Sequence, residues 1–440
     1  MEPKLRSHII YLITQGLFFL LLLAVFAGIL LGFVPIKHQL FARRAAALLR
    51  ANGIDSCSVA AVEITAWRSI TIQGLYCKTS VDSSESCTFR SAKVVLPINI
   101  LQYYLNKKRI IAIAHSDSGI SPKQLISHPG ILARRVLSLC TVFSNGLNGS
   151  FSDVWMTVQK KGKTVFLGTG GQIELSPLED NNDELLLDAR FPIINALGDG
   201  MQNVKCTAML TTDGQLSIGD LSAVYFDGHL KAKGSIALFE NDLKTSYAVT
   251  IEKLDFSYWY AMHCSTGKIT GTANIACRGE DIPFNSLDST FSLSTTIYDC
   301  TVYDLPLQQS LATSLFIPSL SSLEFKKLSL RLRKKDRDTI ATALSGASDQ
   351  ISFSSNGWEL NNGTVQQMVN GVISARMINT FPSDVRKILS AGKNEDWKFS
   401  CRLFGTLDDP RFELDRETLQ RAVGGFFNNL QQEIYEQLMK

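Results

Sequence analysis

The chain has 440 residues, of which 45% are hydrophobic and 19% charged, and its formal net charge is +3. This apolar content is sufficient for a large buried surface and excludes a disordered chain. Basic and acidic residues are interspersed, so the sequence lacks the basic footprint of a nucleic-acid-binding protein. The densest basic cluster, at residues 331–335, is interpreted as the solvated face of a strand.

The N-terminal region contains a long apolar segment. Residues 16–34 read GLFFLLLLAVFAGILLGFV and carry no charge. About 20 such residues in a helix cross the hydrocarbon core of a bilayer. We therefore expect residues 1–35 to form a short cytoplasmic stub and an uncleaved transmembrane anchor. Its apolar surface would include Leu17, Phe18, Leu22, Phe26, Ile29 and Phe33.

A cleaved signal peptide is the competing interpretation, because Lys4 and Arg6 could form its basic region. The apolar segment is longer than a typical signal core, and it is followed by Pro35 and Lys37 instead of a small-residue cleavage site. Basic residues flank the segment on both sides, so charge alone does not orient it. A large domain tends to be translocated regardless of such charges, which favours a position outside the cytoplasm.

Two stretches after the anchor have helical character. Residues 36–52 place Leu40, Phe41, Leu48 and Leu49 near one face, and Gly53 supplies a stop. Residues 121–146 begin with Ser-Pro and end at a glycine, which also predicts helix, interrupted at Pro129-Gly130.

Most of the remaining chain alternates apolar and polar residues with a period of two. The clearest example is Leu328, Leu330 and Leu332, which alternate with Ser329 and arginines. The same alternation occurs in residues 204–210, 247–252, 291–296 and 397–403. Turn sequences such as Asp227-Gly228 separate these segments. Strands with one apolar face, joined by short turns, predict an antiparallel sheet.

A sheet that is apolar on one face must bury that face. The middle of the chain has few amphipathic segments to cover it, so the sheet could pack on a second sheet, close into a barrel, or curl into an apolar groove. The pattern alone favours a filled sandwich or barrel. Residues 415–440 carry apolar residues at helical spacing and are predicted to form a C-terminal amphipathic helix, most simply as a cap on the end of the sheet.

The sequence contains few residue patterns that indicate catalysis or metal binding. Its six histidines are scattered, and no nucleotide-binding, hydrolase or metalloprotease motif is present. The carboxylate pairs Glu280-Asp281 and Asp408-Asp409 are interpreted as turn residues. We therefore expect no catalytic residues, no metal and no cofactor.

The nine cysteines leave alternatives open. Cys77 and Cys87 bracket a polar stretch and could staple a hairpin, and Cys264 and Cys277 could do the same. Buried free thiols are the other possibility.

In its order of features, the sequence resembles the AsmA-like proteins of bacterial envelopes. The N-terminal anchor is followed by LFARRAAALLRANGI and WRSITIQGLYC, and then by SAKVVLPINILQYYLNKKRIIAIAHSDSGI. The segments GKITGTANIACRG and TIYDCTVYDLPL resemble the family's glycine-punctuated strands. FGTLDDPRFELD matches its terminal G-T-L-x-x-P signature, through Gly405, Thr406, Leu407 and Pro410.

This resemblance implies an anchor in the bacterial inner membrane and a curled, taco-like antiparallel sheet in the periplasm. It divides the chain into an N-terminal α+β region at 36–146, a sheet-groove region at 147–414 and the C-terminal helix. The implied function is lipid binding, in phospholipid transport between the envelope membranes or in outer-membrane biogenesis and homeostasis. Phospholipids, the inner membrane and envelope proteins would be the partners, and nucleic acid would not.

On the groove interpretation, acyl chains would lie along the apolar strand face. The candidate lining residues are Val249, Ile251, Leu328, Leu330 and Phe399. The alternative function is a non-transporting envelope scaffold, or an assembly factor for outer-membrane proteins, with a filled β core.

Overall fold

The chain is mainly β and forms two compact units, residues 1–214 and 215–440. The computed structural model describes residues 36–37, 39–51, 55–65, 69–80, 85–96, 149–177, 184–196, 198–211, 215–237, 244–283, 290–305, 308–309, 321–334, 340–361, 364–383, 385–386, 395–406, 410–418 and 420.

Several predicted elements lie outside these residues. They are the membrane anchor at 16–34 with its six named side chains, the helical stretch 121–146, and nearly all of the C-terminal helix. Within the described ranges, no helix combines the length and apolar character needed to cross a bilayer.

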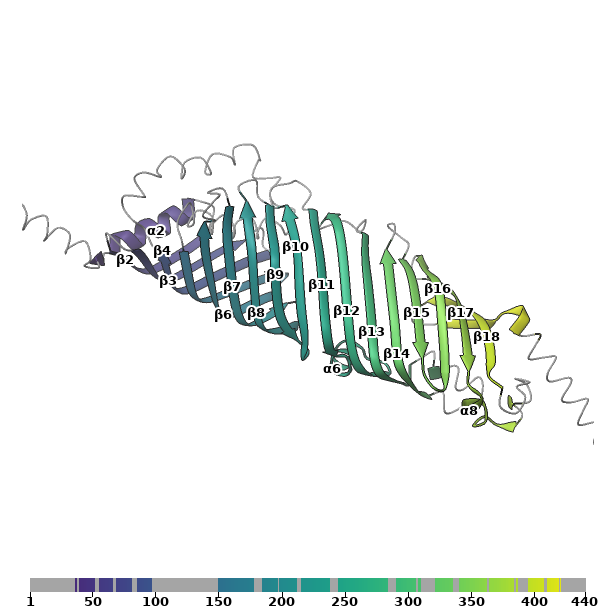
Figure 1. Ribbon diagram of the computed structural model, residues 1–440. Helices are drawn as coiled ribbons and strands as arrows, with labels where there is room; N and C mark the ends of the chain where they lie inside the picture. Colours follow the sequence, from purple (N-terminus) through teal and green to yellow (C-terminus); the bar gives the residue numbers. More distant parts are fainter. Residues whose placement is uncertain are drawn as a thin grey trace, which may run out of the picture. The chain divides into compact units, whose positions relative to one another are not determined.

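The first unit is an antiparallel meander in which each described strand pairs with its neighbour in sequence. Figure 1 shows strands early in this unit running at a steep angle to later ones, so the sheet is strongly twisted and curled. Its strands are β1 (Ile36–Lys37), β2 (Ser56–Thr65), β3 (Ser69–Ser80), β4 (Glu85–Leu96), β5 (Gly149–Lys160), β6 (Lys163–Pro177), β7 (Glu184–Ala196) and β8 (Asp199–Thr211).

The predicted helix at 36–52 is confirmed as α2 (Gln39–Ala51), although Ile36 and Lys37 form β1 instead. Ala42, Ala46 and Leu49 are buried because their spacing places them on one helical face. Leu40 was expected on that face but is 56% exposed. The helix packs beside β2, where Arg50 Nη2 donates to the carbonyl oxygen of Cys57 at 2.9 Å.

One face of the first sheet, its inner face, carries an almost completely buried apolar core. The alternation predicted at 204–210 is confirmed in β8, where Val204, Ala208 and Leu210 are buried. The other buried apolar strand residues are Cys57, Val62, Ile72, Leu75, Cys77, Cys87, Val94, Leu96, Phe151, Val154, Ile173, Leu175, Ala189, Phe191 and Ile194.

The second unit is also an antiparallel meander, and short helices occur between some of its strands. The alternating segments predicted at 247–252, 291–296, 328–333 and 397–403 are confirmed as parts of β11, β13, β14 and β18. The elements are β9 (Gln215–Tyr225), β10 (Gly228–Ala237), β11 (Lys244–Asp255), α6 (Phe256–His263), β12 (Lys268–Pro283), β13 (Thr290–Tyr303), β14 (Ser322–Lys334), β15 (Ile340–Ala347), β16 (Ile351–Asn361), β17 (Thr364–Ile373), α8 (Ala375–Ile378), β18 (Trp397–Thr406) and β19 (Pro410–Leu414).

In neither unit do the described outermost strands pair with one another to close the sheet.

Glu280 and Asp281, expected in a turn, lie within β12. Asp415 accepts a hydrogen bond from the Thr418 amide at 2.9 Å, which caps the helical turn that begins at residue 416.

Tight turns set the register of neighbouring strands. Between β9 and β10, Phe226 and Asp227 have φ values of 45° and 60°, as a type I′ turn requires. The predicted Asp227-Gly228 turn is therefore displaced by one residue, and Gly228 pairs with Tyr225.

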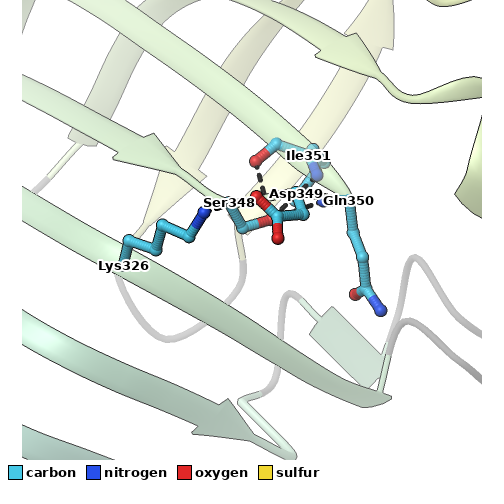
Figure 2. Close-up of polar contacts among 5 residues, drawn as sticks. All are labelled: Lys326, Ser348, Asp349, Gln350 and Ile351. Carbon is cyan, nitrogen blue, oxygen red and sulfur yellow. Dashed lines mark hydrogen bonds and ion pairs between the residues drawn. The ribbon is translucent and has the colours of Figure 1, made fainter.

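The turn between β15 and β16 is held by a serine side chain (Figure 2). The amides of Gln350 and Ile351 donate to Ser348 Oγ at 3.0 and 2.9 Å. Lys326 on β14 reaches Asp349 at 2.7 Å, and its hydrogen bond holds the pKa of that carboxyl below its ordinary value. Both side chains are well exposed, so this ion pair contributes little to stability.

Phenylalanine rings lie over glycines on adjacent strands. A Cβ atom added at Gly371 would lie 2.3 Å from Phe399 Cζ, and one at Gly346 would lie 2.5 Å from Phe353 Cε1. The two members of each pair are direct register partners. The ring of Phe399 therefore covers the backbone of β17.

Replacing Gly371 with alanine should destabilise the chain. The added methyl group would collide with the ring of Phe399, and overpacking of this kind costs about 1–3 kcal/mol. Urea unfolding of the full chain would measure the loss. In the double variant Gly371→Ala, Phe399→Leu, the two costs should be clearly non-additive. Simple additivity would show that the ring is not what excludes a side chain at position 371.

Candidate functional site: the inner face of the second unit

The register of the second unit aligns its apolar side chains in cross-strand rows. These rows define its inner face, the face that carries the buried side chains. One row runs through Ile251, Ile275, Thr295, Leu330 and Leu344. A second row, beside it, runs through Ile297, Leu328, Gly346, Phe353, Gly371 and Phe399.

All five candidate lining residues share this inner face. Ile251 and Leu330 lie in the first row, and Leu328 and Phe399 lie in the second. Val249 precedes Ile251 by two residues on β11 and therefore projects to the same side. Their surroundings differ, because Ile251 is only 8% exposed whereas the other four are half-buried.

One end of this face is closed by α6. Leu254, Ala273 and Cys300 are at most 1% exposed and pack in one cluster with Phe256 of the helix. Asp255 caps α6 by accepting from the Tyr258 amide at 3.2 Å, and Trp259 Nε1 donates to Tyr225 Oη at 3.2 Å. Ile251 belongs to this cluster, and Val249, Ile275 and Leu328 pack against it.

Along the same end, α8 closes the later strands. Ile373, Met377, Ile378 and Phe381 form a second buried cluster. Phe399 packs against it and stacks on Trp397, with ring centroids 5.5 Å apart. Phe399 therefore lies at the closed end, held by Gly371 and by α8.

Farther from the closed end, the burial pattern is inverted. The large apolar side chains of Leu330 and Leu344 are half-buried. The short polar side chain of Ser355, which pairs with Leu344, is only 3% exposed. That of Thr295, which pairs with Leu330, is 9% exposed. Beneath a second protein layer the large apolar groups would be the most buried. Here they project past their small neighbours, as the lining of an apolar surface would.

Two polar side chains on this face lack hydrogen-bond partners. Gln367 on β17 is 3% exposed, and neither its amide nitrogen nor its amide oxygen has a partner. Thr342 on β15 is 5% exposed, and its hydroxyl is likewise unpaired. The two residues flank β16, where shifts in register interrupt the regular ladder. Such groups carry a desolvation cost that most proteins avoid.

Potential metal ligands and free thiols both occur in the part of the chain that the structure describes. That part contains no group of three or more potential metal ligands. Burial raises the pKa of the Cys300 thiol to about 11, which keeps it protonated and unreactive at neutral pH.

The described residues of the predicted family signature lie on the paired strands β18 and β19. Gly405 has a φ of 110°, a conformation that favours glycine, and it pairs with Pro410 at the start of β19. Thr406 ends β18, and Leu407 lies outside the described residues.

Comparison of the chain with models of protein families, with curated proteins and with solved structures finds no match.

Replacing Gln367 with methionine should stabilise the protein. The substitution keeps the length of the side chain and removes an unpaired buried amide, so the free energy of unfolding should rise by about 1 kcal/mol. Urea unfolding at equilibrium would measure this change.

Ser355→Ala is the matched control. Ser355 is equally buried, but its Oγ is hydrogen-bonded to both the amide and the carbonyl of Leu344, at 3.1 and 3.2 Å. Its loss should therefore destabilise the chain by about 1 kcal/mol. If the Gln367→Met variant also lost about 1 kcal/mol of unfolding free energy, the Gln367 amide would have a hydrogen-bond partner in solution.

Proposed function

We propose that the protein binds the acyl chains of phospholipids along the inner face of its second unit. In this proposal it is a membrane-anchored, AsmA-like periplasmic protein that takes part in phospholipid transport between the envelope membranes or in outer-membrane homeostasis. The anchor is the apolar segment 16–34 at the inner membrane. The protein acts by passive binding and is not an enzyme.

The inverted burial pattern is the observation that carries this proposal. The half-buried side chains of Leu330 and Leu344 lie in register on adjacent strands, farther from the closed end. Partly covered leucine side chains offer apolar contact to a hydrocarbon chain without selecting a particular chemical group. That is the surface an acyl chain requires.

The energetics are adequate for retention of lipid. Each methylene group removed from water contributes about 0.8 kcal/mol. A contact with only half of an acyl chain would therefore contribute several kcal/mol before the costs of ordering the chain. No single residue would dominate the affinity, because this contribution is spread over many side chains.

The candidate lining residues have different roles in this proposal. Ile251 and Phe399 support the closed end, where α6 and α8 pack. Leu330, together with its register partner Leu344, forms the lining itself. Substitutions that test binding should therefore be made in the lining, since those at the closed end would unfold the unit.

The second candidate function is a scaffold or assembly factor with a filled core. The inner face of the first unit favours it, because Val94, Val154 and Leu175 are at most 1% exposed. The closed end of the second unit is filled in the same way. On this alternative, no lipid would accompany the protein.

Leu330→Glu should abolish lipid loading. A carboxylate facing an acyl chain would lose its hydration, which should reduce bound phospholipid at least about tenfold, equivalent to about 1.4 kcal/mol. The measurement is native mass spectrometry with lipid analysis on the full chain, gently extracted from membranes.

Ser345→Glu is the matched control. It introduces the same charge on β15, the strand that pairs with β14, but at an exposed position beside the half-buried Leu344. It should retain its lipid, and circular dichroism should show that both variants keep their strands. Equal lipid loading in the two variants, or a wild-type chain free of phospholipid, would instead support the scaffold.

A further inference from the structure

Two cysteines meet across a strand pair of the first unit. Cys57 on β2 and Cys77 on β3 are direct register partners, and their sulfur atoms lie 3.5 Å apart. Both side chains are buried, with 2% and 5% of their surface exposed. Neither sulfur takes part in any function proposed above.

The backbone geometry suits a covalent bond. Directly opposed residues in an antiparallel ladder have Cα atoms about 4.5–5.5 Å apart. This separation falls within the range of about 4.4–6.8 Å found across disulfides. Closing the sulfur–sulfur distance to about 2.05 Å therefore requires only small side-chain rotations.

The other pairings suggested by the sequence fit less well. Cys87 pairs with Thr79, two residues along β3 from Cys77, so it is a diagonal neighbour of Cys77. Diagonal Cα distances of about 7–8 Å exceed the disulfide range. Cys264 precedes β12 and Cys277 lies nine residues into it, so the extended strand separates them by about 30 Å. A Cys264–Cys277 staple is therefore wrong, and all four cysteines are free thiols in this structure.

The two thiols differ in reactivity. A hydrogen bond from the Cys77 thiol holds the pKa of Cys57 below its ordinary value, and the positive charge of Arg50 adds to this effect. The same hydrogen bond and burial raise the pKa of Cys77. Cys57 is accordingly the sulfur that forms a thiolate and attacks first.

We propose that Cys57 and Cys77 form a disulfide that staples the β2–β3 hairpin when the chain meets an oxidant of the disulfide class, such as oxidised glutathione. The Cys57 thiolate attacks the external disulfide, forms a mixed disulfide and releases one glutathione thiolate, which takes up the proton lost by Cys57. The Cys77 sulfur then displaces the second glutathione, whose sulfur takes up the proton lost by Cys77. Two protein thiols are oxidised, and one glutathione disulfide is reduced to two thiols.

The bond would fix the strand on which α2 packs. Cys57 is separated from Cys77 by 20 positions, and its carbonyl accepts from Arg50 of the helix. Burial would then shield the disulfide from reductants in the folded chain. This inference is independent of lipid binding, so failure of either proposal leaves the other unaffected.

The test uses the full chain in detergent, reduced and then equilibrated with mixtures of oxidised and reduced glutathione. Equilibration is begun in urea, which opens the buried site, and is completed after the urea has been removed. Free thiols are then alkylated, and the digest is analysed by mass spectrometry without reduction. The Cys57–Cys77 peptide should exceed every other cystine peptide by about tenfold or more, because no other two cysteines among the described residues are direct register partners.

Two variants test whether the bond joins Cys57 to Cys77. Cys87→Ala should leave the Cys57–Cys77 bond in full yield. Cys57→Ala should leave Cys77 as an alkylated thiol. Recovery of both Cys57 and Cys77 as alkylated thiols from the wild-type chain would overturn the proposal, and so would transfer of the bond to Cys87 in equal yield.

Discussion

Each of the two units depends on how the apolar face of its strands is covered. Pairing along the meander satisfies the backbone donors and acceptors of the strands, so the ladders alone do not distinguish one unit from the other. The units differ in side-chain burial on the inner face. In the first unit, residues such as Val94 and Leu175 are almost fully enclosed. In the second, α6 and α8 enclose one end of the face, and Leu330 and Leu344 beyond them are only partly covered.

Much of this architecture could be predicted from local sequence. The alternation of Leu328, Leu330 and Leu332 with polar residues requires a strand with two unlike faces, and β14 has them. The helix α6 was not predicted, because its sequence FSYWYAMH is apolar nearly throughout and has no helical stripe. The only local signal was Asp255, which caps it. The register shifts between β16 and its two neighbouring strands also have no local sequence signature, because register depends on both strands of a pair.

The candidate site shows the same division between local and non-local information. Periodicity is sufficient to place Val249, Ile251, Leu328 and Leu330 on apolar strand faces. It does not distinguish a lining residue from a core residue, because the burial of Ile251 depends on α6, and the packing of Phe399 depends on Gly371 and α8. The cysteines make the same point. Nearness in sequence favours Cys77 with Cys87, whereas the register of the β2–β3 hairpin brings Cys57 to Cys77.

The meander also determines how each unit can be assembled. Among the described strands of each unit, every pairing joins strands that are consecutive in the sequence. Contact order is therefore low for an all-β protein, and loop-closure entropy is overcome one hairpin at a time. A chain with this connectivity can gain structure progressively as it leaves a ribosome or a translocation pore. Over evolution, such a sheet can also be lengthened or shortened by whole hairpins without rearranging the strands that remain.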